Sequence, residues 1–169
     1  MSTLLAWYTL IHVIISLVAI VTGFLVINDM LNGRESRCIT MSFLVMTVLT
    51  NATGFGFPIE RILPAHFLAG ISLLALGLAI YGRYFQNLAG KWRVTYVLAA
   101  VFAQYIDVFV LIVQGFLKFP ALHGLAPTQS EPPFAAVQGV NLVAFVIMGV
   151  LAVRRFRPVV HALFRGDQA

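Results

Sequence analysis

The chain has 169 residues, of which 60% are hydrophobic and 10% are charged, whereas a soluble domain carries roughly 25% charged residues. The formal net charge is +5, but no nucleic-acid-binding motif accompanies it, so we expect no nucleic-acid partner. The single cysteine, Cys38, excludes an intrachain disulfide and a four-thiolate metal site. The composition therefore predicts an integral membrane protein.

Five apolar runs are long enough to cross a bilayer. Each holds about 19 to 24 residues, against the ~20 that a helix needs to cross ~30 Å of hydrocarbon. Because backbone groups inside lipid must pair within their own segment, we expect each run to be a helix. The short connections predict a single all-α domain, residues 1–169, built as a bundle of five transmembrane helices. The predicted spans are residues 4–27, 39–57, 63–81, 94–117 and 134–153.

The Lys and Arg residues predict the orientation of the spans. Nearly all of them follow the first, third and fifth spans, beginning with Arg34 and ending in the basic tail, residues 154–169. The opposite connections carry only Arg61 and Lys118. Short cytoplasmic loops are enriched in Lys and Arg. The pattern therefore predicts that the N-terminus lies outside and that the C-terminal tail is cytoplasmic.

Two connections predicted on the outer side are rich in Gly and Pro. Residues 54–58 combine two glycines with a proline that cannot continue a helix. Pro64 suits the first turn of the next helix, so the second and third spans are expected to form a tight hairpin. Residues 118–133 contain four prolines, too many for a regular helix, and we expect an ordered cap there.

Polar residues within the spans gather in the outer half of the predicted bundle. Such residues are costly in lipid and therefore point to function. Counted from the outer helix ends at ~1.5 Å per residue, they lie from roughly 5 Å to roughly 15 Å deep, with one glutamine a turn deeper. This predicts a pocket that opens outward and is closed toward the cytoplasm. Its residues are His12, Asn51, His66, Gln104, Asp107, Gln114, Gln138 and Asn141.

Asp107 and the two histidines carry the chemistry of this predicted pocket. A lone carboxylate near the midplane costs ~2.5 kcal/mol or more, so it must pair with a cation or bind a proton. His12, at similar estimated depth, is the expected partner. His66 lies in the first turn of the third span, where the helix dipole favours the neutral imidazole that ligates metals. His12 and His66 are therefore candidate metal ligands.

Three segments resemble known proteins. They are Thr53-Gly54-Phe55-Gly56-Phe57-Pro58, Pro64-Ala65-His66, and Ala126-Pro127-Thr128-Gln129-Ser130-Glu131-Pro132-Pro133-Phe134. Together they resemble segments of a group of small, uncharacterised multi-span bacterial membrane proteins. The resemblance implies location in the bacterial inner membrane, but it transfers no function.

Three functional interpretations follow. The first is a membrane subunit that binds haem b, a quinone or a metal ion. A haem between His12 and His66 would need them at equal depth, and their estimated offset of roughly 7 Å favours the other two ligands. The second is a structural or assembly partner of other membrane subunits, or of copies of itself, in which the polar groups only join helices. The third is a small proton-coupled transporter using Asp107, which the apolar inner half disfavours. The motifs leave open whether the chain is an enzyme.

Overall fold

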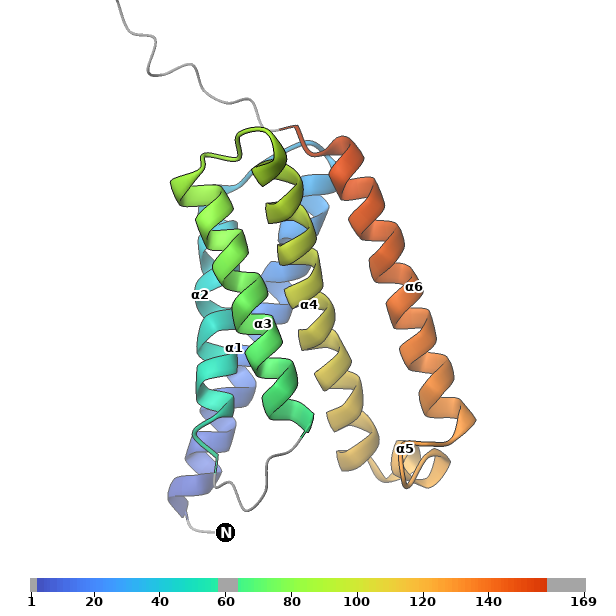
Figure 1. Ribbon diagram of the computed structural model, residues 1–169. Helices are drawn as coiled ribbons and strands as arrows, with labels where there is room; N and C mark the ends of the chain where they lie inside the picture. The colour runs from blue at the N-terminus through green and yellow to red at the C-terminus, as the bar shows by residue number, and fades with distance from the viewer. Residues whose placement is uncertain (1–2, 58–63, 158–169) are drawn as a thin grey trace, which may run out of the picture.

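The computed structural model describes residues 3–57 and 64–157, and this part of the chain is entirely helical, without a strand. Helices α1, α2, α3, α4 and α6 stand side by side and run alternately up and down (Figure 1). The elements are α1 Thr3–Leu31, α2 Arg37–Gly54, α3 Pro64–Ile80, the π-helix η1 Tyr81–Phe85, α4 Lys91–Lys118, α5 Pro120–Leu125 and α6 Pro132–Arg155. The predicted helical bundle is confirmed.

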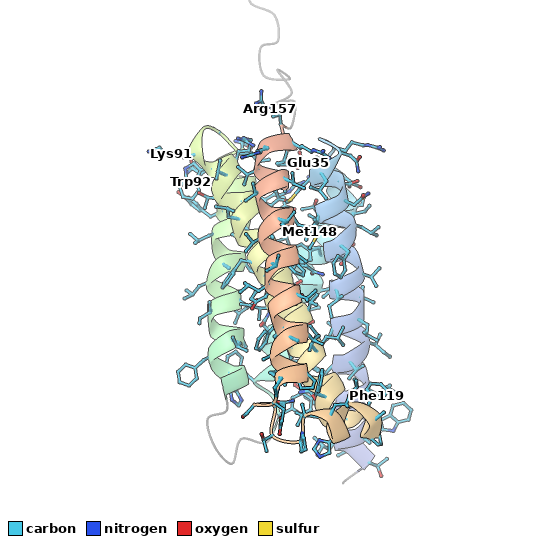
Figure 2. The ribbon with its side chains drawn as sticks, turned by 90° about the vertical axis from the view of Figure 1, so that its right-hand side faces the viewer. Glu35, Lys91, Trp92, Phe119, Met148 and Arg157 are labelled. Carbon is cyan, nitrogen blue, oxygen red and sulfur yellow. The ribbon has the colours of Figure 1, made fainter. Side chains whose placement is uncertain are left out.

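Four stretches of the described chain are long and apolar enough to cross a membrane: α1, His66–Phe85, α4 and α6. Helix α2 is not among them, although it coincides with the second predicted span. Its sequence explains this, since it begins with Arg37 and ends near Asn51 and Thr53. Large apolar side chains on the outer surface of the bundle, such as Leu74 and Val140, are exposed (Figure 2). Such a surface suits lipid rather than water.

The helices run past several predicted span boundaries. Helix α1 continues four residues beyond the predicted end, to Leu31, and includes the polar Asn28 and Asp29. It stops at Gly33, whose positive φ of 65° ends the helix while its N–H bonds to the Met30 carbonyl (3.2 Å). Apolarity predicts only the part of a helix that lies in hydrocarbon, whereas the backbone hydrogen bonds extend into the interface. The predicted turn 58–63 and tail residues 158–169 lie outside the described part of the chain.

The two ends of the bundle differ in chemistry. We call the end that holds Arg83, Arg93 and Arg155 the arginine end, and the opposite end, which holds His12 and His66, the histidine end. The arginine end lies at the top of Figure 1, where α3 connects to α4. The apolar core lies mainly toward the arginine end, and Asn51, Asp107, Gln138 and Asn141 are buried nearer the histidine end. Gln104 is buried at the middle of α4, against Gly23 of α1.

Arginine side chains tie the helices together at the arginine end. Arg83, turned inward by the π-helix, forms an ion pair with Glu35 and lies over the Tyr96 ring, 5.7 Å from its centroid. Nη1 of Arg93 donates to the carbonyls of Val153 (2.8 Å) and Phe156 (2.6 Å), which end α6. A cation at a helix C-terminus satisfies carbonyls that lack an intrahelical donor. These contacts close the bundle at this end.

The connection 118–133 is ordered, as predicted, but six of its residues form α5. Pro120 begins this helix because its missing N–H is not needed in the first turn. The side chain of Glu131 accepts hydrogen bonds from Thr128 N (3.1 Å), Thr128 Oγ1 (2.9 Å) and Ser130 N (3.0 Å). Desolvation raises the pKa of Glu131, but these hydrogen bonds together outweigh it and hold the pKa of the carboxyl below its usual value.

Candidate functional site

The eight predicted pocket residues fall into three groups. Five are buried, two are half-buried, and Gln114 is exposed. Gln114 lies seven residues beyond Asp107 on α4, about 10 Å farther along the axis. Thr47 of α2 lies beside Asp107, and α2, which runs in the same direction as α4, ends seven residues later at Gly54, so Gln114 is level with the end of α2. The buried residues are Asn51, Gln104, Asp107, Gln138 and Asn141, and the half-buried ones are His12 and His66.

His12 is held at the histidine end by Thr53 of α2. His12 Nδ1 lies 2.7 Å from Thr53 Oγ1, which also lies 2.7 Å from the carbonyl oxygen of Leu49. The single hydroxyl proton is used toward Leu49, so His12 Nδ1–H donates to Thr53 Oγ1. In the neutral imidazole this leaves the lone pair on Nε2, the form that ligates metals or accepts protons.

Both histidines pack against the Gly-Phe-Gly-Phe segment that ends α2. The His12 ring lies edge-on to Phe57, with centroids 5.1 Å apart, and the His66 ring lies 5.7 Å from that of Phe55. The two imidazoles therefore belong to one end of the bundle but contact different rings. In residues 3–57 and 64–157, no group of three or more His, Cys, Asp or Glu side chains could hold a metal ion. A metal on His12 or His66 would need further ligands from elsewhere.

The expected pairing of His12 with Asp107 is wrong, because no ion pair joins these two described residues. Asp107 instead faces Thr47, whose hydroxyl interacts with the Asp107 carboxyl group. Thr47 lies six residues before Thr53 on α2, which places Asp107 about 9 Å deeper than His12. Counting depth from each helix end missed this offset, because the first residues of α1 extend beyond the end of α2 (Figure 1).

Each of three buried amides donates to a fixed acceptor. Gln104 Nε2 donates to the Ile20 carbonyl of α1 at 2.8 Å, and Gln138 Nε2 of α6 donates to the Phe109 carbonyl of α4 at 3.2 Å. Asn51 Nδ2 donates to the Thr47 carbonyl (2.8 Å) and to Ser72 Oγ of α3 (3.2 Å). These bonds fix which end of each amide is nitrogen. They also join neighbouring helices.

Several buried polar atoms from the middle of the bundle toward its histidine end make no hydrogen bond of good geometry, although the Thr47 hydroxyl and the Asp107 carboxyl interact with each other. An unpaired polar group costs about 1–3 kcal/mol when it is buried. Native proteins therefore rarely keep several such atoms together without water, an ion or a ligand. Within the described residues of this region they are Thr47 Oγ1, Thr50 Oγ1, Gln104 Oε1, Asp107 Oδ2, Gln138 Oε1 and Asn141 Nδ2.

The contacts between α4 and α6 show that most of these atoms lie at one level. A Cβ atom on Gly149 would lie 3.6 Å from Val101, and the Phe145 and Tyr105 rings are 5.8 Å apart. These two contacts are four residues apart on each of the two antiparallel helices. The next step of four residues pairs Asn141 with Phe109, in agreement with the bond from Gln138 to the Phe109 carbonyl. Asp107 lies only two residues, about 3 Å, from Phe109 along the axis, but about 200° around the helix from it, so its side chain faces α2 and not α6. We call the residues with unpaired atoms at this level the polar layer: Thr47, Thr50, Asp107, Gln138 and Asn141.

The sequence prediction did not include Thr47, Thr50 or Ser72 in the site. Thr47 shares the buried face of α2 with Asn51, four residues later, and this spacing is the signal that could have found it. Ser72 had no such signal, because its role depends on how α3 is placed against α2. No protein-family model, curated protein or solved structure matches the chain, so its site is argued from its own geometry.

Proposed function

We propose that the chain crosses a bacterial inner membrane five times, with its N-terminus outside and its arginine end in the cytoplasm. Helix α2 lies beside α1 and α3 (Figure 1) and exposes Met41, Val45 and Leu49, which suit contact with lipid. In the described ranges, every Lys and Arg except Lys118 lies at the arginine end. This asymmetry supports a cytoplasmic arginine end. The bacterial location rests on the resemblance of three segments, residues 53–58, 64–66 and 126–134, to small bacterial membrane proteins.

Reporter fusions test this topology. An enzyme that is active only outside the cytoplasm should work when fused after Pro120 and fail when fused after Arg157. The opposite result would mean that α2 does not cross the membrane or that the orientation is reversed, and activity at both sites would mean that α6 does not cross it.

Within this topology, the best-supported function is that of a membrane subunit that binds a small ligand in the polar layer. The observation that carries this proposal is the set of unpaired polar atoms on α2, α4 and α6, enclosed in the outer half of the bundle. Lipid cannot satisfy them, and a bound group with matching donors or charge would. The closed arginine end favours binding over conduction, because a transport path needs polar groups on both sides.

A structural or assembly role is the second candidate, and the amide bonds support it. Three amides donate N–H groups across helix pairs: Gln104 joins α4 to α1, Gln138 joins α6 to α4, and Asn51 joins α2 to Ser72 of α3. This role explains the amide donors. It does not explain why Gln138 Oε1 and Asp107 Oδ2 are buried without partners.

The ligand-binding proposal is tested on full-length protein in mild detergent. Haem is detected by its absorption spectrum before and after dithionite, a quinone by solvent extraction, and a metal by elemental analysis. An exchangeable ligand is detected because adding it raises the melting temperature, Tm. We expect a bound group in the wild type and in Gln114→Leu, the exposed control on the same helix, and reduced binding in Asp107→Asn. The proposal is wrong if no group co-purifies and no added haem, quinone or cation raises Tm.

A further inference from the structure

The arginine end carries an excess of exposed positive charge that the described residues do not neutralise. Eight Lys and Arg residues lie at this end, with two acidic residues, Asp29 and Glu35. Glu35 pairs with the buried Arg83, and Arg93 is used by the carbonyls at the end of α6. No other ion pair forms within residues 3–57 and 64–157. The six remaining cations are exposed, and we call them the basic surface: Arg34, Arg37, Lys91, Arg154, Arg155 and Arg157.

Three segments of the chain bring the basic surface together around the end of α6. A Cβ atom on Gly33 would lie 3.4 Å from the carbonyl oxygen of Arg155, so the loop between α1 and α2 lies against the end of α6. The side chain of Arg93 joins the start of α4 to the same place through its bond to the Phe156 carbonyl. Arg157 follows directly, at the top of Figure 2. Like charges gathered at one end of a bundle favour an anionic partner.

Two cations of the basic surface continue the lipid-facing sides of their helices. Residues four apart lie on one face of a helix. Arg37 is four residues from Met41, which is 57% exposed, and Arg154 is four residues from Val150, which is 47% exposed. Both arginines therefore extend an apolar outer surface to the boundary between acyl chains and headgroups, where long basic side chains reach the interface. This placement favours a phospholipid headgroup over a soluble acidic protein as the partner.

We propose that the basic surface docks the headgroups of anionic phospholipids in the cytoplasmic leaflet, and that this contact stabilises the folded bundle. The inference goes beyond the ligand-binding function, because it uses no residue of the polar layer. A guanidinium donates paired N–H groups to phosphate oxygens, and basic residues near an anionic membrane surface are attracted to it. Phosphatidylcholine carries its own cation beside the phosphate, so it matches the basic surface less well than phosphatidylglycerol does.

The experiment measures Tm by tryptophan fluorescence of the full-length protein in an uncharged detergent, while phosphatidylglycerol is titrated into the micelles. Phosphatidylcholine, inorganic phosphate and polyglutamate are the comparison arms. We expect phosphatidylglycerol alone to raise Tm until binding is saturated, because a ligand that binds the folded state stabilises it. The rise should shrink in 1 M NaCl, where the screening length is about 3 Å. In Arg37→Gln and in Arg154→Gln, the phosphatidylglycerol concentration that gives half of the rise should increase about fivefold, the share of one basic residue at an anionic surface.

Lys118→Gln is the matched control, since it removes an exposed cation at the histidine end and should keep the full response to phosphatidylglycerol. Equal Tm values in phosphatidylglycerol and phosphatidylcholine would overturn the proposal, as would an unchanged half-rise concentration in both arginine variants. An equal rise with inorganic phosphate would overturn it in favour of a site for free anions. A rise with polyglutamate alone would overturn it in favour of an acidic protein.

Discussion

Gly23 on α1 is the position where the packing of the bundle makes its sharpest prediction. A Cβ atom there would overlap Oε1 and Cδ of Gln104 and would lie 2.9 Å from Cε2 of Phe43. Gln104 cannot move away cheaply, because it is fully buried and its Nε2 is bonded to the Ile20 carbonyl. Gly23→Ala must therefore either break that hydrogen bond or push α1 away from α4.

Two destabilising effects and one stabilising effect set the change in the free energy of unfolding. Overpacking costs about 1–3 kcal/mol, and stranding the groups of the Gln104–Ile20 bond adds a further ~1–3 kcal/mol. Alanine returns about 0.5–1 kcal/mol because it is the better helix former. We expect Gly23→Ala to lower the free energy of unfolding by about 2–4 kcal/mol.

Denaturant titration in mild detergent, followed by tryptophan fluorescence, measures this loss. Gly77→Ala is the control, since a Cβ atom at Gly77 of α3 would have no neighbour within 4 Å, and it should be neutral or slightly stabilising. The double variant Gly23→Ala, Gln104→Ala should recover part of the loss, because it removes the overlapping amide. If Gly23→Ala and Gly77→Ala have the same stability, the contact between α1 and α4 is not as the structure has it.

Two further predictions concern the histidine end of the bundle. A Cβ atom on Gly56 would overlap the Tyr8 hydroxyl, which donates to the Thr53 carbonyl at 2.6 Å, whereas one on Gly54 would have its nearest neighbour at 4.0 Å. Gly56→Ala should therefore melt several degrees below Gly54→Ala. Equal Tm values would contradict the packing of Tyr8. Because the pKa of Glu131 is lowered in the folded protein, its carboxylate stabilises the fold at pH values above its ordinary pKa of 4.5. This stabilisation is lost as the pH falls through the lower pKa of the folded state. Glu131→Gln should remove this part of the acid dependence of Tm, and identical pH profiles of the two proteins would show that the loop bonds do not stabilise the fold.

The five long helices could be predicted from the sequence, because apolar runs of about 20 residues favour helices, but the short α5 was not predicted. Each of the five apolar runs coincides with a helix or, for residues 63–81, with α3 and the start of the π-helix. The boundaries were less predictable, because Asn28 and Asp29 continue the α1 hydrogen bonds in a region where hydropathy predicts none. The inward turn of Arg83 was also not predictable, since nothing in the sequence Tyr-Gly-Arg-Tyr-Phe distinguishes a π-helix from an α-helix.

The candidate site was predicted from the estimated depth of each polar residue in its helix, and this estimate identified five residues that are buried in the bundle. It did not identify their partners. Whether His12 meets Asp107 or Thr53 depends on how far α1 extends beyond α2, which is set by side-chain packing such as the fit of Gln104 against Gly23. That fit involves residues 81 positions apart, and neither residue alone carries a signal of it.

The orientation of the buried amides separates those that only join helices from those that belong to a site. Gln104 Oε1 rests against Gly23, where a larger residue would not fit, so this side chain is accounted for by packing and by its bond to Ile20. Gln138 is oriented in the same way, by a backbone carbonyl, but its free oxygen lies at the level of Asp107, where the layer holds a carboxylate and hydroxyls. An amide that only joined helices would gain nothing from that placement. A backbone bond that fixes the nitrogen and leaves a buried oxygen without a donor is what a preorganised ligand site requires.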